Sequence, residues 1–297
     1  MKHWKAIMLA LLEVKKVNKL LRAALYRLKR QKLFWILLAA SFICGVIFGI
    51  ISFFENDLDG LFVAPLFLIM GIYVSLSVGQ EYNDATIRNK VIVGHTKGTI
   101  FVSELIINAF ACLAMMLAFI LPAFICCYSI LLSNTTMEKM LMTWICLLLA
   151  SVVYAAIFNL ISCLISQKAI GAILCILIVF AMAFGANRLE FSIFQVESIT
   201  IEQTNELGEI ISAEVIPNPS YVDGITRKMY MAVDSLIPNG QVNNLMVYLG
   251  STSTNAEDGG LQIFSEEMLP FYPIYSIGLA IVLSFAGWLA FRKKELK

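Results

Sequence analysis

The stretch Leu33-Phe-Trp-Ile-Leu-Leu-Ala-Ala-Ser-Phe-Ile-Cys-Gly-Val-Ile-Phe-Gly-Ile-Ile-Ser-Phe-Phe54 has 22 residues and no charged side chain. At 1.5 Å per residue, a helix of this length crosses the ~30 Å hydrocarbon core of a bilayer. It is too long for the apolar part of a signal peptide, it follows a basic lead of 32 residues, and Phe53-Phe54-Glu55 offers no small-residue cleavage site. The stretch therefore predicts a helix that stays in the membrane.

The rest of the chain has the same character. Of its 297 residues, 59% are apolar and only 14% are charged, and the mean hydropathy is +0.80. A soluble domain carries roughly 25% charged residues, so a water-soluble fold is excluded. The formal net charge is +1, so the chain as a whole lacks the excess of basic residues that is typical of a nucleic-acid binder.

Five further stretches are long enough to cross a bilayer, and all six lack Asp, Glu, Lys, Arg and His. The predicted spans are residues 33–54, 61–79, 105–132, 141–165, 169–187 and 269–291. The chain is thus expected to be an all-α polytopic membrane protein. Ion-coupled carriers keep ionisable groups at membrane depth, although each costs at least ~2.5–3.5 kcal/mol to insert. Their absence indicates that the driving energy is not carried inside these spans.

The placement of Lys and Arg predicts the orientation. With six crossings, residues 1–32, 80–104, 166–168 and 292–297 lie on one side, and they hold 18 of the 22 basic residues. This side is expected to be cytoplasmic, with both chain ends there and the protein in the plasma membrane of a bacterial cell. The opposite segments are residues 55–60, 133–140 and 188–268, which hold four basic and sixteen acidic residues.

Residues 1–32 are predicted to form a basic amphipathic helix. The apolar residues at helical spacing are Trp4, Ile7, Leu11, Val14, Leu21, Leu25 and Leu28, with Lys and Arg mostly on the other face. Such a helix is expected to lie in the cytoplasmic headgroup plane with its apolar face toward the lipid. It could serve as an anchor, as a docking element for a cytoplasmic partner, or as both.

Residues 188–268 are predicted to form a small α+β extracytoplasmic insert. Alternation over 191–202, a turn at Asn205–Gly208 and β-favouring residues at 210–216 predict a hairpin. Helical spacing over 225–236 ends at Pro238-Asn239-Gly240, before a second short helix over 242–249. A lid that shapes substrate exit and a scaffold for dimer contact are equally open roles.

The loop between the second and third spans is predicted to hold a short helix. Asn83 or Asp84 is a suitable N-cap, and Gly94 is a suitable C′ residue. Ile87 and Val91 form an apolar i,i+4 pair, which could enter a groove on another protein or lie on the membrane surface. Arg88 and Lys90 flank this pair.

The loop and the span pattern together resemble the permease subunits of bacterial type-2 ATP-binding-cassette exporters. The similarity covers nearly the whole chain: six spans, a very short connection at Ser166-Gln167-Lys168, and a large insert before the last span. Its most specific part runs from Glu81 to Lys97. Asp84-Ala85-Thr86 stands where the family commonly has Gly-Thr, and Lys97 stands where Arg is frequent.

The resemblance implies a pair of permeases, as a homodimer or heterodimer, bound to two cytoplasmic ATPase subunits that carry the ATP and Mg²⁺. It also implies that the loop is the coupling helix seated on the ATPase. The candidate coupling residues are Glu81, Asp84, Thr86, Ile87, Arg88, Lys90, Val91 and Lys97.

No catalytic, cofactor or metal site is expected in the chain itself. The only histidines are His3 and His95, and no Gly-x-x-x-x-Gly-Lys-Ser/Thr phosphate loop is present. All seven cysteines lie within apolar spans, where they are expected to be buried hydrophobes. The main polar groups in spans three and four are Asn108, Tyr154, Asn159 and Ser162, which could link helices or line a substrate path.

These observations predict a permease subunit that moves a hydrophobic or amphipathic substrate, such as a peptide, drug or lipid-like molecule, with ATP hydrolysed by separate subunits. The alternative is a non-transporting membrane sensor or immunity protein, whose outer domain binds a ligand or partner.

Overall fold

The computed structural model describes residues 17–55, 63–134, 136–204, 210–250 and 268–295. It contains six helices long and apolar enough to cross a membrane, as predicted, and the protein is therefore a multi-pass membrane protein. They are α2 (Lys32–Glu55), α3 (Ala64–Asn83), α5 (Lys97–Asn134), α6 (Met137–Leu164), α7 (Lys168–Ile193) and α11 (Tyr272–Lys293).

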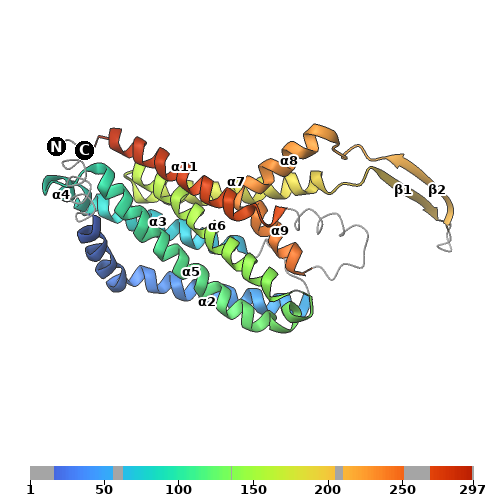
Figure 1. Cartoon of the computed structure of the whole chain (residues 1–297), viewed down its shortest axis with the longest axis horizontal. Helices are drawn as coiled ribbons and strands as arrows, with labels where there is room; N and C mark the ends of the chain where they lie inside the picture. Colours follow the sequence, from blue (N-terminus) through green and yellow to red (C-terminus); the bar gives the residue numbers. More distant parts are fainter. Residues whose placement is uncertain (1–16, 56–62, 135, 205–209, 251–267, 296–297) are drawn as a thin grey trace, which may run out of the picture.

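The long helices run roughly side by side in an elongated bundle (Figure 1). The short helix α4 (Thr86–Ile92), the N-terminal helix of residues 17–30 and the C-terminal end of α11 gather at one end, called here the α4 end. The helices α8 (Gly224–Leu236) and α9 (Pro238–Gly250) gather toward the opposite end, called the α8 end. The bundle thus has two ends with different structures.

The core of the bundle lies between α3 and α6, the two most buried of the six spans. The Phe67 ring of α3 stacks on the Tyr154 ring of α6 with centroids 4.2 Å apart, and Tyr154 stacks in turn on Phe158 at 5.3 Å. The helices α2, α7 and α11 surround this core, and large apolar side chains stay exposed on their outer faces. This pattern is expected when lipid, rather than water, surrounds the bundle.

The helices α2 and α5 pack closely because α2 carries two glycines one turn apart. A Cβ at Gly45 would lie 2.3 Å from the Phe119 carbonyl oxygen of α5. A Cβ at Gly49 would lie 2.6 Å from the Cys126 Cβ of the same helix. This Gly-x-x-x-Gly spacing lets two membrane helices bring their backbones together, and van der Waals contact drives such packing in lipid.

The N-terminal helix packs partly against the protein. Its buried side chains are Leu20, Ala24 and Leu28, which face the protein at i, i+4 and i+8. Of the predicted apolar face, Leu28 is therefore covered by protein, whereas Leu25 is exposed. The residues of the expected face from 4 to 14 lie outside the described residues. The protein itself, rather than lipid alone, therefore covers part of this helix.

The helix α7 continues to Ile193, past residue 188, where the insert was predicted to begin. The strands β1 (Ser198–Thr204) and β2 (Ile210–Pro217) form an antiparallel hairpin that projects from the bundle (Figure 1), with Ile199 opposite Ile216. The predicted turn at 205–208 lies outside the described residues. The predicted first helix corresponds to α8.

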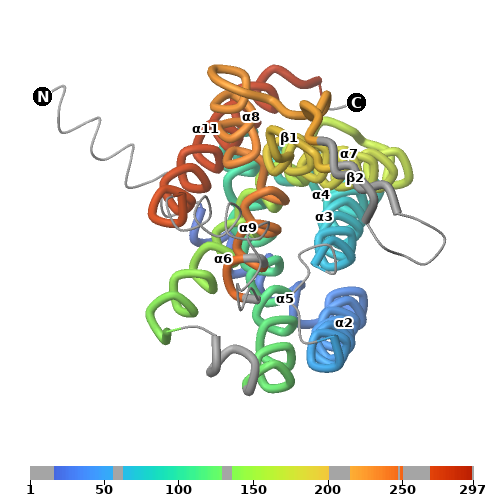
Figure 2. Tube along the Cα trace, turned by 90° about the vertical axis from the view of Figure 1, so that its right-hand side faces the viewer, coloured from blue at the N-terminus to red at the C-terminus, as the bar shows by residue number. Residues whose placement is uncertain are grey.

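The second helix of the insert packs against the membrane helices. Pro238 begins α9, where a turn was predicted, because proline fits the first helical position. Val242, Leu245 and Leu249 are buried, and α9 contacts α5, α6, α7 and α8. Figure 2 shows α9 near the middle of the bundle viewed along its length. This helix therefore closes the α8 end of the core.

Candidate functional site at the α4 end

The helix α4 begins through an unusual backbone conformation. Its N-cap is Ala85, whose φ of 52° is left-handed, while Asn83 is the last residue of α3 and Asp84 is the C-cap of α3. The prediction that Asn83 or Asp84 caps α4 is therefore wrong. Because α3 continues further than its apolar stretch, both residues end the preceding helix instead.

The predicted C-terminal boundary of α4 is confirmed. Gly94 has a φ of 96° and its N–H donates to the Val91 carbonyl at 3.0 Å. The His95 N–H donates to the Lys90 carbonyl at 3.1 Å. This pair of hydrogen bonds is a Schellman motif, which satisfies the last carbonyls of a helix. A helix of seven residues is thus held at its end by local bonds.

Replacing Ala85 with glycine should stabilise the protein by up to about 1 kcal/mol. The left-handed conformation costs roughly 1–2 kcal/mol for a residue with a Cβ, and the greater freedom of glycine in the unfolded chain offsets part of this gain. Thermal unfolding in detergent measures the effect. Gly94→Ala is the matched opposite change, since open space surrounds Gly94, and it should lower the melting temperature through backbone strain alone. An unchanged or lower melting temperature for Ala85→Gly would contradict the strain argument.

The two faces of α4 differ from the predicted ones. Ile87 is only 2% exposed, and Val91 packs partly against the core of the same chain. Ile87 therefore does not belong to an exposed docking face, because the chain itself fills the space around it. The exposed apolar side chains are Ile92, at 74%, and Val93, at 78%. Arg88 is also exposed.

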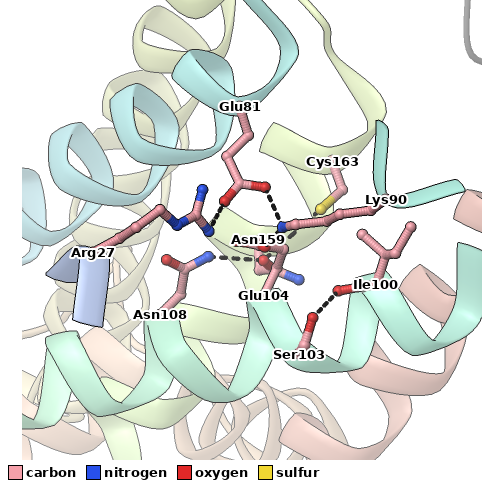
Figure 3. Close-up of polar contacts among 9 residues, drawn as sticks. All are labelled: Arg27, Glu81, Lys90, Ile100, Ser103, Glu104, Asn108, Asn159 and Cys163. Atoms are coloured by element: carbon pink, nitrogen blue, oxygen red, sulfur yellow. Dashed lines mark hydrogen bonds and ion pairs between the residues drawn. The ribbon is translucent and has the colours of Figure 1, made fainter. Parts of the chain in front are cut away.

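Four charged side chains meet where α4 faces the bundle (Figure 3). Lys90 Nζ of α4 lies 2.6 Å from Glu81 Oε2 of α3 and 2.7 Å from Glu104 Oε1 of α5. Arg27 of the N-terminal helix forms an ion pair with the other oxygen of Glu81. The set of Arg27, Glu81, Lys90 and Glu104, called here the charge cluster, joins four elements of the chain.

The charge cluster is balanced, and its two carboxylates are buried. Glu81 and Glu104 are 5% and 3% exposed, and two positive groups match their two carboxylates. Burial alone would lower the pKa of Lys90, but the carboxylates of Glu104 and Glu81 outweigh burial and raise it. Lys90 is therefore charged at neutral pH. Ion pairs in such a site are strongly coupled, since removing one member leaves its partner buried and uncompensated.

The charge cluster corrects one expectation, since Glu81 was expected in the loop but lies within α3. Glu104 directly precedes the apolar stretch of the third span. Because α5 begins at Lys97, Glu104 lies within the helix, where it pairs with Lys90. Both helices thus extend beyond their apolar stretches, and these polar side chains are paired internally.

A cavity of about 350 Å³ adjoins the charge cluster. Arg27, Glu81 and Glu104 line it from three elements, and the predicted site residues Asp84 and Thr86 line it at the start of α4. The exposed side chain of Asp84 thus lies near the ion pairs without joining them. The structure therefore places three of the predicted coupling residues, Glu81, Asp84 and Thr86, around one hollow.

A second group of contacts fastens the end of α11 beside α4. Lys294 Nζ donates to Tyr82 Oη at 2.9 Å and to the Cys163 carbonyl at 3.0 Å. It also lies 4.2 Å from the centroid of the Tyr82 ring. Lys97 Nζ donates to the Lys294 carbonyl at 2.5 Å. Burial lowers the pKa of Lys294. The predicted coupling residue Lys97 therefore holds the C-terminal end of α11.

The polar side chains predicted in spans three and four link helices. Asn108 Nδ2 donates to Asn159 Oδ1 at 2.9 Å, which joins α5 to α6 (Figure 3). The Tyr154 hydroxyl donates to Asn239 Oδ1 of α9. All of these side chains are buried, as is Ser162. A substrate path along these residues stays a prediction.

Sequence reasoning did not find Arg27, Tyr82 or Lys294. Arg27 is one of ten basic residues in the first 32, and no local pattern distinguishes it from the others. Tyr82 and Lys294 are 212 positions apart, so only the folded chain brings them together. Glu81 was predicted through the family resemblance, whereas Glu104 was not among the predicted site residues.

The fold and this site define a multi-pass membrane protein with a buried ion-pair cluster under a short helix at one end of its bundle. No protein-family model matches the chain, and no curated protein matches it. Among the described residues, no group of three or more His, Cys, Asp or Glu side chains could hold a metal ion.

Proposed function

We propose that the protein is the membrane-embedded permease subunit of an exporter, and that a separate cytoplasmic ATP-binding-cassette ATPase drives it. In this proposal the α4 end faces the cytoplasm, and α4 seats on the ATPase. Two permease chains form the transport unit. The substrate is a hydrophobic or amphipathic molecule, since the six predicted spans lack ionisable residues that would suit an ion.

The observation that carries the proposal is the two-sided construction of α4. Its inner side is tied to the bundle through Ile87 and through the bonds of Lys90 to α3 and α5. Its outer side presents Arg88, Ile92 and Val93. A short helix is marginal alone, so these internal ties make it move as one body with α3 and α5. Such an element suits the transfer of a force from a bound partner to membrane helices.

The charge distribution in the sequence supports the same orientation. Residues 1–32 and 292–297 hold fourteen of the 22 Lys and Arg residues. Both segments lead to the α4 end, where residue 17 and the end of α11 lie close together around one cavity. The positive-inside rule places such an end in the cytoplasm, where an ATPase would bind.

Replacing Ile92 or Val93 with aspartate should reduce the amount of ATPase that co-purifies with the tagged chain at least tenfold. A buried charge in an apolar contact is costly, and both side chains are exposed in the isolated chain, so its own fold should not suffer. The measurement is Mg²⁺-ATP hydrolysis per mole of chain purified from native membranes in mild detergent, with the ATPase subunit identified by mass spectrometry.

Gln167→Glu is the control for this experiment. Gln167 is exposed in the α6–α7 connection at the same end, beside the contacts of Lys294. It should retain the ATPase. Wild-type chain that purifies without any ATPase would contradict the proposed function. Full ATPase recovery with both aspartate variants would contradict the docking face on α4.

The projecting hairpin favours the second candidate, a membrane sensor or immunity protein. Ile199 and Val215 are exposed on strands that extend away from the bundle, where a ligand or partner could bind. The two candidates differ in one measurable respect. A sensor of this kind retains its response after α4 substitutions, whereas a permease loses ATP-driven transport.

A further inference from the structure

The corner between α8 and α9 contains a network of buried polar side chains. Gln241 Nε2 donates to the Ser235 carbonyl at 2.7 Å, and Ser276 Oγ of α11 donates to Gln241 Oε1 at 2.8 Å. Asn244 Nδ2 of α9 donates to Asp234 Oδ2 of α8 at 2.7 Å. The network therefore fastens α8, α9 and α11 to one another at the α8 end.

Asp234 is the only carboxylic acid in these hydrogen bonds, and it is 0% exposed. Its second oxygen, Oδ1, has no hydrogen-bond partner among the described residues. Asn244 Oδ1 and the Tyr272 hydroxyl also have no partner there. Tyr272 lies close enough to Asp234 and to Asn244 to interact electrostatically with both side chains. Three buried oxygens without partners thus occur around one carboxyl group, where each costs about 1–3 kcal/mol.

A proton on Asp234 resolves this arrangement. An ionised carboxylate only accepts hydrogen bonds, so it could accept one from the Tyr272 hydroxyl but offers nothing to the Asn244 amide oxygen. A protonated carboxyl donates from Oδ1 while Oδ2 still accepts from Asn244. Its new donor can satisfy Asn244 Oδ1, so that the acid and the amide are paired through both of their polar atoms.

The surroundings of Asp234 also oppose its charge. Within the part of the chain that the structure describes, no Lys or Arg forms an ion pair with it. Burial raises the pKa of Asp234 to about 7, although the hydrogen bond from Asn244 lowers it. Gly240 approaches so closely that a Cβ there would collide with the carboxyl group, which leaves little room for a counter-ion.

The neighbouring titratable groups do not supply a positive charge. Glu190 of α7 and Cys146 of α6 both interact electrostatically with Tyr272 of α11. The titratable side chain of α9 is Tyr248, whose ring faces Lys139 of α6. On α8 itself, Arg227 stacks on Tyr221 and Lys228 is exposed. The basic side chains of these elements thus lie on other partners or are exposed, and among the described residues none forms an ion pair with Asp234.

We propose that Asp234 is a proton-binding site: below neutral pH it is a carboxylic acid paired with the Asn244 amide, and its proton holds the α8–α9 corner closed. Loss of the proton leaves a buried charge without a counter-ion, so the corner loosens as the pH rises. The proposal concerns the fold of the α8 end and does not depend on the proposed transport function.

The sign of the pH dependence follows from the raised pKa. An unfolded Asp titrates near 4, whereas the folded group titrates at about 7. Between these values the unfolded chain binds fewer protons than the folded chain, so the free energy of unfolding decreases as the pH rises. Above about 7 this contribution is lost and the dependence becomes flat.

Asp234→Asn in the full-length chain tests the proposal, because an asparagine amide can donate and accept as the protonated acid does. The melting temperature in detergent is measured from acidic to alkaline pH. The wild type should lose several degrees as the pH rises, and Asp234→Asn should remove this loss and be at least as stable as the wild type above neutral pH. Asp223→Asn, at the exposed N-cap of α8, should behave as the wild type.

Hydrogen exchange of residues 237–244 in the wild type gives a second measurement that requires no variant. After correction for base catalysis, exchange should be at least tenfold faster above neutral pH than in acid. An Asp234→Asn chain that is less stable than the wild type at every pH would overturn the proposal. A sodium-dependent rise in the melting temperature, seen in the wild type and lost in Asp234→Asn, would also overturn it in favour of a cation site.

Discussion

Lys90→Met should destabilise the α4 end by about 3–5 kcal/mol, the cost of removing one member of a buried ion pair. Lys90 Nζ contacts the carboxylates of both Glu81 and Glu104. Without it, Arg27 still pairs with Glu81, but no other ion pair among the described residues compensates Glu104. Thermal unfolding in detergent and hydrogen exchange of residues 86–92 measure the loss.

Two further variants distinguish the loss of the ion pair from the other effects of Lys90→Met. Arg88→Met removes a charge from the exposed face of the same helix and should change the stability by no more than about 0.5 kcal/mol. The double variant Lys90→Met with Glu104→Leu should recover most of the loss, because an apolar pair replaces a buried ionic one at little cost. A double variant as unstable as Lys90→Met would show that lost packing, rather than an uncompensated charge, causes the effect.

The same Lys90→Met variant bears on the proposed function. If α4 transfers force through Lys90 to α3 and α5, the variant should still bind the ATPase through Ile92 and Val93. ATP hydrolysis should then continue while transport is lost. If the variant transports as much substrate per ATP hydrolysed as the wild type, the charge cluster does not couple ATP hydrolysis to transport.

Gly45→Val should destabilise the bundle by about 3 kcal/mol, the upper part of the usual range for overpacking. The added Cβ would meet the carbonyl oxygen and Cα of Phe119, at 2.3 and 2.9 Å, and Cγ of Pro122 at 2.9 Å. Backbone atoms cannot rotate away as a flexible side chain can. The helices α2 and α5 must therefore separate, which loses their contact along several turns.

Gly278→Val is the matched control for this change. It introduces the same side chain into a membrane helix, α11, at a position where a Cβ meets nothing within 4 Å. Its melting temperature in detergent should stay near that of the wild type. Equal destabilisation by the two substitutions would mean that β-branching in a helix, rather than the α2–α5 contact, is responsible.

Local patterns predicted most of the helices, and they failed where distant side chains decide the outcome. The third span was predicted from Leu105, where the apolar residues begin, yet α5 begins at Lys97 and includes Glu104, which is paired with Lys90. The pair Ile87 and Val91 was expected to face outward. The sequence could not show that α4 turns Ile87 inward, since that depends on the left-handed residue Ala85 between α3 and α4.

The number of membrane helices is determined by the sequence alone. The length of an apolar stretch is a local property, and a stretch that matches the hydrocarbon thickness of the bilayer can cross it as a helix. The end of α4 at Gly94 is local in the same way. Only the tertiary structure decided which charges are paired, which face of α4 is exposed and that Asp234 is buried beside Asn244. These properties arise from distances between separate helices, and the energy of a charge depends on whether a partner lies within reach in a dry interior.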